Sequence, residues 1–279
     1  MKYCLSIIVL LLFVSCNSTN TKTNTLSEEN SIRHSSKEEQ EKIIQEHLKE
    51  GVWTKGLYSI AWQEEIDKGL AKDSTIAYLW QQKAMPLYKQ GKYELAKKYI
   101  DQAVKYDRDQ HQDYRAFMSC IFSKRYTEAI ADFEDCIKRR GNSYVMDHSY
   151  YFYIALSKLQ LNEFAEAESI LKTDIQRQKE SQGEDWVHYL DYYYLGVAEY
   201  EQGKYEEAGE SFDEVLKLYS EFAEALYYKG NCLNHLGQKD EAIAIRRQAM
   251  ENGKKGYSFN EDNSIYERYP YQMRWELYQ

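Results

Sequence analysis

The sequence predicts an all-α protein built from stacked antiparallel helical hairpins, and its proline content and an internal repeat support this fold class. Only Pro86 and Pro270 occur among 279 residues. An average chain carries about 5 % proline, so turn-rich β architectures are disfavoured and long helices are favoured. The phrase GKYELAKKYIDQAVKYD, beginning at Gly91, returns as GKYEEAGESFDEVLKLY, beginning at Gly203. In both copies a small and a bulky residue four positions apart share one helical face.

Each copy of the phrase follows another apolar-periodic segment, so the repeated unit is a helical hairpin with the glycine in its turn. Small residues in both hairpins allow the paired helices to approach closely where they cross, and a larger side chain there should push them apart. These residues are Ala84, Ala96, Gly196 and Ala208. Pro86 lies inside the first helix of its hairpin, where it removes a hydrogen-bond donor and should produce a local kink.

The hairpin pattern resembles the tetratricopeptide repeat, a unit of about 34 residues with an aromatic residue, a small residue, a turn glycine and further small residues at fixed positions. Trp80, Ala84, Gly91, Ala96 and Ala103 carry this pattern in the first copy. The resemblance extends to Gly256 and divides the array into five repeats. Their ranges are 77–110, 110–143, 148–181, 189–222 and 223–256.

The turns and connections vary between the repeats. Lys124 stands at the second turn and Asn162 at the third, where asparagine tolerates left-handed geometry. The polar stretches 139–148 and 177–186 predict longer connecting loops. Arg246 occupies the bulky position of the fifth repeat, as a capping helix that faces water allows.

Segments outside these repeats complete the predicted fold. A degenerate hairpin over residues 37–76 precedes the array, with helices expected at 38–50 and 60–72. Stacked hairpins share a continuous core, so we expect a right-handed α-α superhelix, the tetratricopeptide solenoid, of five clear repeats plus this hairpin. Residues 257–279 are Tyr-rich and are not a repeat. This segment either caps the last hairpin or lies back in the groove of the solenoid, and Pro270 argues against one continuous helix.

The N-terminus predicts export and lipidation. Lys2 is followed by an apolar run over residues 5–14, which is too short to span a bilayer but has the length of a signal-peptide h-region. The ending FVSC resembles the lipobox of bacterial lipoproteins, although Phe13 stands where leucine is usual. The resemblance implies a signal peptide over residues 1–15 and lipidation of Cys16. The alternative is an ordinary cleaved signal followed by a free thiol.

The resemblance to lipoproteins also implies a cellular address. Residues 16–36 are polar and lack apolar periodicity, so we expect a flexible tether between the lipid and the array. Asn17 after the cysteine favours the outer membrane of the bacterial envelope, on its periplasmic face or at the surface. The odd set Cys120, Cys136 and Cys232 does not indicate a disulfide framework, and we expect buried thiols. A bridge between the first two is the alternative.

The sequence does not predict an active site, a cofactor or a metal site. Its six histidines are scattered, without a His-Glu-x-x-His motif or paired cysteines for zinc. His188 lies between Asp185 and Asp191, and a surface or capping role is the favoured interpretation. No nucleophile elbow, phosphate-binding loop or dinucleotide fingerprint occurs. The formal net charge of -9, without a basic cluster, argues against a nucleic-acid partner.

Binding is therefore the expected activity. In the tetratricopeptide family the first helix of each hairpin lines a concave groove, and the resemblance implies a mostly aromatic set of groove-binding residues. They are Tyr88, Tyr114, Arg115, Phe152, Tyr193, Tyr200, Tyr227 and Asn231. The set lacks the Lys/Asn/Arg pattern with which some family members grip a C-terminal carboxylate, so a peptide with apolar and aromatic anchors is expected. For each tyrosine, packing between helices is the alternative.

These observations lead to three hypotheses about function. The first is a non-catalytic adaptor that binds another protein or peptide of an envelope complex, by resemblance to lipoproteins of outer-membrane protein assembly or pilus biogenesis. The second is a lipoprotein that binds a glycan or a small molecule, and the third is an enzyme. Alanine at Tyr193 and Tyr227 should weaken a groove ligand under the first two, whereas an activity lost with His188 would indicate the third.

Overall fold

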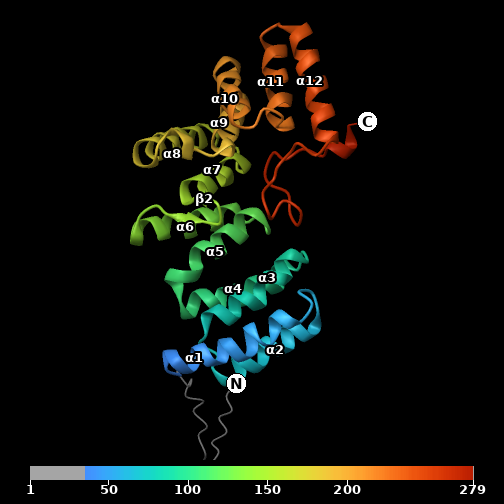
Figure 1. Cartoon of the computed structure of the whole chain (residues 1–279). Coiled ribbons are helices and arrows are strands. Elements are labelled where there is room, and N and C mark those ends of the chain that lie inside the picture. Colours follow the sequence, from blue (N-terminus) through green and yellow to red (C-terminus); the bar gives the residue numbers. More distant parts are fainter. Residues whose placement is uncertain (1–34, 279) are drawn as a thin grey trace, which may run out of the picture. The chain divides into compact units, whose positions relative to one another are not determined.

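Antiparallel helical hairpins make up most of residues 35–278, the part of the chain that the computed structural model describes (Figure 1). Within each hairpin the two helices contact one another, and the second contacts the first helix of the next hairpin. The helices are α3 (Ala77–Lys89) and α4 (Tyr93–Tyr106), α5 (Arg108–Ile121) and α6 (Tyr126–Arg140), α7 (Tyr150–Gln160) and α8 (Phe164–Gln182), α9 (Tyr189–Glu201) and α10 (Tyr205–Leu218), and α11 (Ala223–His235) and α12 (Lys239–Lys254). The predicted all-α tetratricopeptide solenoid is confirmed.

The degenerate hairpin before the array is also helical. It consists of α1 (Lys37–Ile44), a π-helical turn (Gln45–Lys49), a 3-10 turn (Val52–Thr54) and α2 (Ile60–Lys72). Ser36 caps α1 through a capping box with Glu39. α2 packs against α3 through a small apolar core that includes Leu48 and Ile66, both fully buried. The N-terminal hairpin therefore joins the array through apolar contact.

Helix α3 continues through Pro86 because α2 satisfies the backbone group that proline leaves free. Pro86 has no N–H to donate to the Gln82 carbonyl, and the Trp62 indole Nε1 donates to that oxygen at 3.1 Å. One residue further on, the side-chain Nε2 of Gln63 donates to the Lys83 carbonyl at 3.2 Å. The neighbouring helix thus offsets part of the cost of an internal proline. The local kink stays a prediction.

The turns between the paired helices adopt the left-handed backbone geometry that the sequence predicts for them. Gly91 and Gly203 have φ values of 72° and 76°. Asn162 has a φ of 61°, which confirms the role predicted for it, and Lys124 has a φ of 56°. A non-glycine residue in this region costs of order 1–3 kcal/mol, so the contacts of Lys124 have to compensate for it.

The predicted close crossing of the helices is confirmed at the fourth repeat. A Cβ atom added to Gly196 would lie 2.7 Å from Cε1 of Phe212 on the facing helix, closer than real side chains approach. Ala208 is fully buried in the same contact. The fifth repeat uses Gly230 in the same way, because an added Cβ would lie 2.5 Å from Cγ of Arg246. The absence of a side chain at Gly230 leaves space for the aliphatic part of Arg246, which occupies the bulky position of the fifth repeat.

The two long connections differ from one another. Residues 141–149 carry a short antiparallel pair, β1 (Tyr144–Val145) with β2 (His148–Ser149). The loop expected from residue 177 is wrong, because α8 continues to Gln182 and only a 3-10 turn (Glu184–Trp186) follows. Buried Asp174 stabilises the extra helical turns by accepting hydrogen bonds from Ser149 Oγ at 2.6 Å and Gln178 Nε2 at 3.0 Å.

The three cysteines of the array are free and buried, as predicted, and the alternative bridge between Cys120 and Cys136 does not form. Burial raises the pKa of Cys120 and Cys136 to about 11 and that of Cys232 to about 12. The thiols are therefore protonated and unreactive near neutral pH.

The predicted signal peptide, the lipidation site Cys16 and most of the predicted tether lie outside the described residues. Among residues 35–278, no helix combines the length and the apolar character needed to cross a membrane.

Candidate functional site

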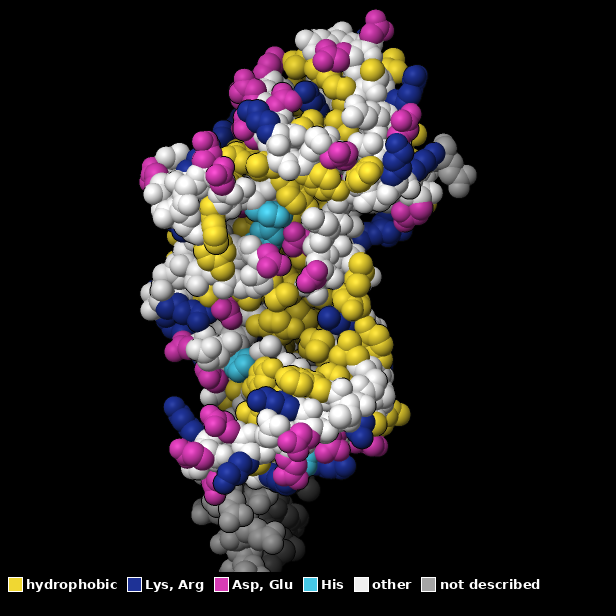
Figure 2. All heavy atoms as spheres, in the orientation of Figure 1, with side chains coloured by type: hydrophobic (Ala, Val, Ile, Leu, Met, Phe, Trp, Pro, Cys, Tyr) yellow, Lys and Arg dark blue, Asp and Glu magenta, His cyan; other side chains and the backbone are white. Residues whose placement is uncertain are grey.

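The C-terminal segment, residues 257–278 and hereafter the tail, leaves α12, extends along the array and returns to α12 (Figure 1, red). It is irregular apart from a 3-10 turn at Trp275–Leu277. Two of its aromatic side chains, Phe259 and Tyr269, are buried in the same continuous apolar cluster as the helices of the array. The tail is thus part of the core of the molecule. Figure 2 shows hydrophobic side chains gathered along the middle of one face and charged side chains spread around them.

The outgoing part of the tail packs on the last two repeats. The Ala223 amide donates to the Tyr257 carbonyl at 2.9 Å, which fixes the start of the tail at the beginning of α11. The Phe259 ring lies edge-on to Tyr193 and Phe222, with centroids 5.6 and 5.4 Å apart. The Tyr189 hydroxyl donates to Asn260 Oδ1 at 2.6 Å.

The far end of the tail reaches the first two repeats. The Lys89 ammonium lies 4.4 Å from the centre of the Tyr266 ring, within the range of a cation–π contact. The Tyr93 hydroxyl donates to the Glu267 carboxylate, and Lys124 donates to a tail carbonyl. Lys124 also lies 3.5 Å from a Glu267 oxygen. These contacts tie the left-handed turn at Lys124 to the tail.

The returning part of the tail is held by its backbone. The Tyr194 hydroxyl donates to the Pro270 carbonyl at 2.9 Å, and the Tyr193 hydroxyl donates to the Tyr271 carbonyl at 3.0 Å. Burial raises the pKa of both tyrosines well above the usual value, so both hydroxyls remain donors over the physiological range. Pro270 and Tyr271 lie in a turn closed by the Gln272 amide on the Tyr269 carbonyl, and Tyr271 has a φ of 59°. The two donors therefore hold the backbone of a turn and not a particular side chain.

A buried carboxyl anchors the end of the tail. Glu224 on α11 is fully buried, and its Oε1 accepts from the Ser258 hydroxyl at 2.6 Å, the Trp275 indole at 2.9 Å and the Met273 amide at 3.3 Å. Burial raises the pKa of Glu224. The Trp275 indole lies against Gly253, where any Cβ would overlap it. Only glycine at this position of α12 accommodates the ring.

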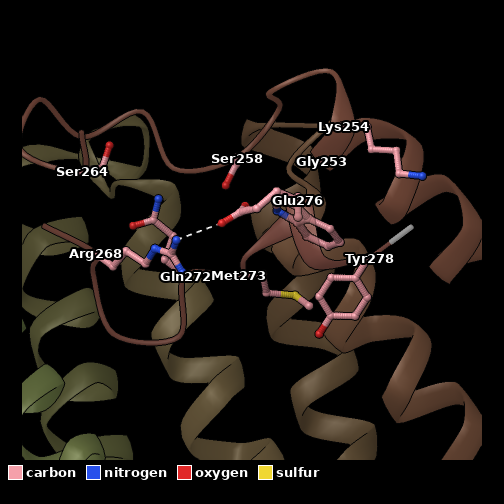
Figure 3. A pocket seen from close by; sticks show the side chains of 10 residues that line it. Gly253, Lys254, Ser258, Ser264, Arg268, Gln272, Met273, Glu276 and Tyr278 are labelled. Carbon is pink, nitrogen blue, oxygen red and sulfur yellow. Dashed lines mark hydrogen bonds and ion pairs between the residues drawn. The ribbon is translucent and has the colours of Figure 1, made fainter. Parts of the chain in front are cut away.

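A cavity of about 520 Å³ lies beside this anchor, between the tail and the end of α12 (Figure 3). Arg268 and Glu276 form an ion pair of 3.0 Å between two parts of the tail that line it. Ser258, Met273 and Tyr278 also line the cavity. Its wall is made mostly of tail residues, so the cavity depends on the docked position of the tail.

The predicted groove residues do not form one open surface. Tyr88, Phe152 and Tyr193 are at most 1 % exposed, so in this arrangement they do not meet an external ligand. Tyr193 contacts the tail, and Tyr227 packs against Trp275 with ring centroids 6.1 Å apart. Residues of the tail therefore occupy the positions where a ligand of the last repeats was expected.

The remaining predicted residues lie elsewhere and are partly exposed. Arg115 forms ion pairs with Asp101 at 3.0 Å and Asp132 at 2.7 Å, so its charge is already matched. Tyr114 packs beside Phe117, Tyr200 packs among aromatic rings of the fourth and fifth repeats, and Asn231 is half-buried on α11. Sequence reasoning missed Tyr189, Tyr194 and Glu224. The run YLDYYY, residues 189–194, was a usable signal for the first two, because successive helical residues cover adjoining faces.

His188 has the capping role that the sequence favours. It is the N-cap of α9, with Nδ1 accepting from the Leu190 amide at 3.4 Å and the Asp191 carboxylate accepting from the His188 amide at 3.2 Å. Burial and the nearby imidazole of His148 lower the pKa of His188 to about 4. The His188 imidazole is therefore neutral at pH 7.

The fold and the repeat pattern define a tetratricopeptide-repeat solenoid. Models of the tetratricopeptide repeat match residues 77–110 and 192–255 of the chain. A comparison with curated protein sequences found no match.

Several solved structures share the fold at low sequence identity. PilW, a type IV pilus biogenesis factor, has a TM-score of 0.61 and 15 % identity over 82 % of this chain and 99 % of its own. A tetratricopeptide repeat protein from Parabacteroides merdae has a TM-score of 0.58 and 13 % identity over 82 % and 96 %. YrrB, described as having an unusual peptide-binding site, has a TM-score of 0.50 and 18 % identity over 69 % and 94 %. At these identities the likeness establishes the fold alone.

Proposed function

We propose that this protein is a non-catalytic protein-binding scaffold, anchored at the bacterial cell envelope through lipid on Cys16, which binds an aromatic segment of a partner protein. The observation that carries the proposal is the way the array holds its own tail. The hydroxyls of Tyr193 and Tyr194 grip two consecutive tail carbonyls, and Phe259 fills an aromatic site between Tyr193 and Phe222. The same surface suits a foreign segment of similar chemistry.

The recognition would combine two elements. Donors to backbone carbonyls supply affinity that does not depend on side-chain identity, and a site for one aromatic ring supplies selectivity. The competing tail is part of the same molecule, so its effective concentration is in the range typical of short tethers, about millimolar. A partner segment therefore has to bind more tightly than the tail, or bind when the docking of the tail is already weakened.

Two of the structural relatives support this proposal by analogy. YrrB is described by its peptide-binding site and PilW as a type IV pilus biogenesis factor, so proteins of this fold include a peptide binder and a pilus biogenesis factor. Fold does not determine function, so these relatives give no partner for this chain.

Photo-crosslinking in cells tests the binding surface. The chain would carry a photoreactive probe at Tyr193, or at Ile243 of α12 as a matched exposed position, 50 % exposed. Each probe would be placed in the full chain and in a Trp275→Ala variant, in which the tail docks less tightly on the array. We expect a discrete foreign protein crosslinked at Tyr193, with a higher yield in the variant.

Other outcomes of this experiment contradict parts of the proposal. Foreign adducts at Ile243 alone would overturn the assigned surface while leaving a scaffold. Adducts at Tyr193 that contain only tail residues, in both backgrounds and with none at Ile243, would overturn protein binding.

The anchoring is tested separately by Cys16→Ser. We expect the full chain to incorporate an alkyne-labelled fatty acid and to sediment with membranes, and the variant to lose both properties. A wild-type chain that takes up no fatty acid would overturn the lipid anchor and indicate a protein with an ordinary cleaved signal peptide.

A further inference from the structure

Three potential metal ligands from separate parts of the chain meet beside the tail. His148 comes from β2, His188 from the N-cap of α9 and Glu261 from the tail. One ligand atom of each lies within 4.8 Å of the other two. His148 Nε2 and Glu261 Oε2 are 3.3 Å apart. That is roughly the spacing of two ligands on a tetrahedral ion with bonds of about 2.0–2.1 Å.

The rings are positioned by packing. The His148 ring stacks on Phe152, with centroids 3.8 Å apart and an angle of 9° between the planes. The His188 ring lies against Tyr189, with centroids 4.4 Å apart. His148 is 2 % exposed and Glu261 9 %, so both are largely removed from water. Ligands that are fixed in this way lose little freedom when an ion binds.

We infer that His148, His188 and Glu261 form a site for a divalent transition metal, Zn²⁺ in the first instance, which fastens the tail to the third and fourth repeats. Two imidazoles and one carboxylate are a donor set that suits zinc, whereas magnesium and calcium take oxygen ligands. The inference does not depend on the lipid anchor or on a partner protein.

The surroundings leave room for a fourth ligand. A cavity of about 220 Å³ is lined by both histidines and by Asp191 and Gln178, so a water molecule can complete a four-coordinate ion. Two existing contacts are exchanged. The ion takes the place of the hydrogen bond between His148 Nε2 and Glu261 Oε2. When the neutral imidazole of His188 binds a metal, its Nδ1 no longer accepts a hydrogen bond from the Leu190 amide. That hydrogen bond is long, at 3.4 Å, and the Asp191 carboxylate still caps helix α9.

Zinc binding to the purified full chain in detergent tests the site. After treatment with EDTA and removal of the chelator, titration with ZnCl2 should show one site per chain. Replacing a ligand should weaken binding by roughly 100-fold or more, because even partners outside the ligand shell are worth 10–100-fold. The variants are His148→Ala, His188→Ala and Glu261→Gln. His235→Ala, an exposed histidine, and Asp262→Asn, an exposed tail carboxyl, are the matched controls.

The position of the tail supplies a second readout. Zinc should slow tryptic cleavage after Arg268 in the wild type and in both controls, but not in Glu261→Gln, whose array keeps every histidine and should remain folded. Co²⁺ in place of zinc should give the visible absorption of a tetrahedral site. If the wild type binds zinc no more tightly than His148→Ala does, the proposed site is wrong. Tight binding that leaves cleavage at Arg268 unchanged would overturn its role in fastening the tail.

Discussion

The array and the tail are held together by different physical means. In the array, stability comes from a repeated pattern, in which small residues such as Gly196 face bulky ones such as Phe212. In the tail there is no period, and each contact is individual, as with Trp275 against Gly253 or Tyr194 on the Pro270 carbonyl. A repeat protein can therefore hold a non-repeating segment in its core through contacts that are individual to that segment.

Two buried carboxyls distinguish the N-terminal hairpin from the surface under the tail. Asp73, in the N-terminal part, accepts hydrogen bonds from Thr75, Gln40 and the Ser35 amide, and these outweigh burial and lower its pKa to about 2. Glu224, under the tail, has its pKa raised by burial. The N-terminal hairpin is therefore stabilised by an ionised group, whereas the tail is docked against a carboxyl whose pKa is raised.

Removal of the tail anchor should have the largest effect. Trp275→Ala leaves a cavity beside Gly253 and deprives Glu224 of a donor, and the expected loss is about 3–5 kcal/mol, the range for large buried aromatic residues. Hydrogen exchange should show this loss in the tail and little change in α4 to α6. Trp186→Ala, at a residue 55 % exposed, is the control. An equal loss of protection throughout the array would show that the tail is not a separate unit.

Enlarging a helix crossing should have the next largest effect, and within the array. Gly196→Ala drives Phe212 from its place and should cost about 1–3 kcal/mol, measured by urea denaturation. Gly209→Ala, where an added Cβ meets nothing within 4 Å, should stabilise α10 by roughly 0.5–1 kcal/mol. If both substitutions change the free energy of unfolding by the same amount, the close helix crossing at Gly196 does not contribute to stability.

Acid should affect the N-terminal hairpin and the docking of the tail in opposite directions. The pKa of Asp73 is lower in the folded chain than in the unfolded chain, so its stabilisation is present above about pH 4 and is lost as the pH falls toward 2, on the order of 2 kcal/mol. The pKa of Glu224 is raised, so its carboxyl becomes protonated in the docked state before the pH has fallen to the usual glutamate value. This removes the cost of burying the charge and favours docking. Hydrogen exchange in the presence of EDTA should show α1 and α2 loosening before the tail. The opposite order would contradict the assignment.

Single hydroxyls should have the smallest effect. Tyr193→Phe and Tyr194→Phe each remove one hydrogen bond to a tail carbonyl and should cost about 1 kcal/mol of docking free energy. The measurement is the rate of proteolysis after Arg268. Tyr257→Phe, at a residue 41 % exposed, should change nothing. No effect at either buried tyrosine would indicate that aromatic packing alone holds the tail.

The sequence predicted the array well because its information is local and periodic. Turn residues, small residues and apolar spacing lie within one repeat, so Asn162 and Gly196 had the predicted roles. The prediction of a loop from residue 177 was wrong because the buried side chain of Asp174 accepts a hydrogen bond from Gln178 and so stabilises the helix in this polar stretch. Composition alone does not show such a contact.

The site was less predictable because its contacts are long-range. Trp275 and Glu224 lie 51 positions apart, and His148 and Glu261 lie 113 apart. Nothing in the spacing joins them. The predicted role of Tyr193 came from the repeat pattern, which places a residue on a face but does not show what covers that face.

Hydrogen exchange of the full chain, resolved at the tail, tests most directly the claim that the tail docks on the array. We expect the amides of Ala223 and Met273, which donate to Tyr257 and Glu224, to be protected, and tail peptides around Phe259 and Tyr269 to exchange far more slowly than an unstructured chain. Exchange of residues 257–278 at the unstructured rate, with α9 and α11 still protected, would contradict the account.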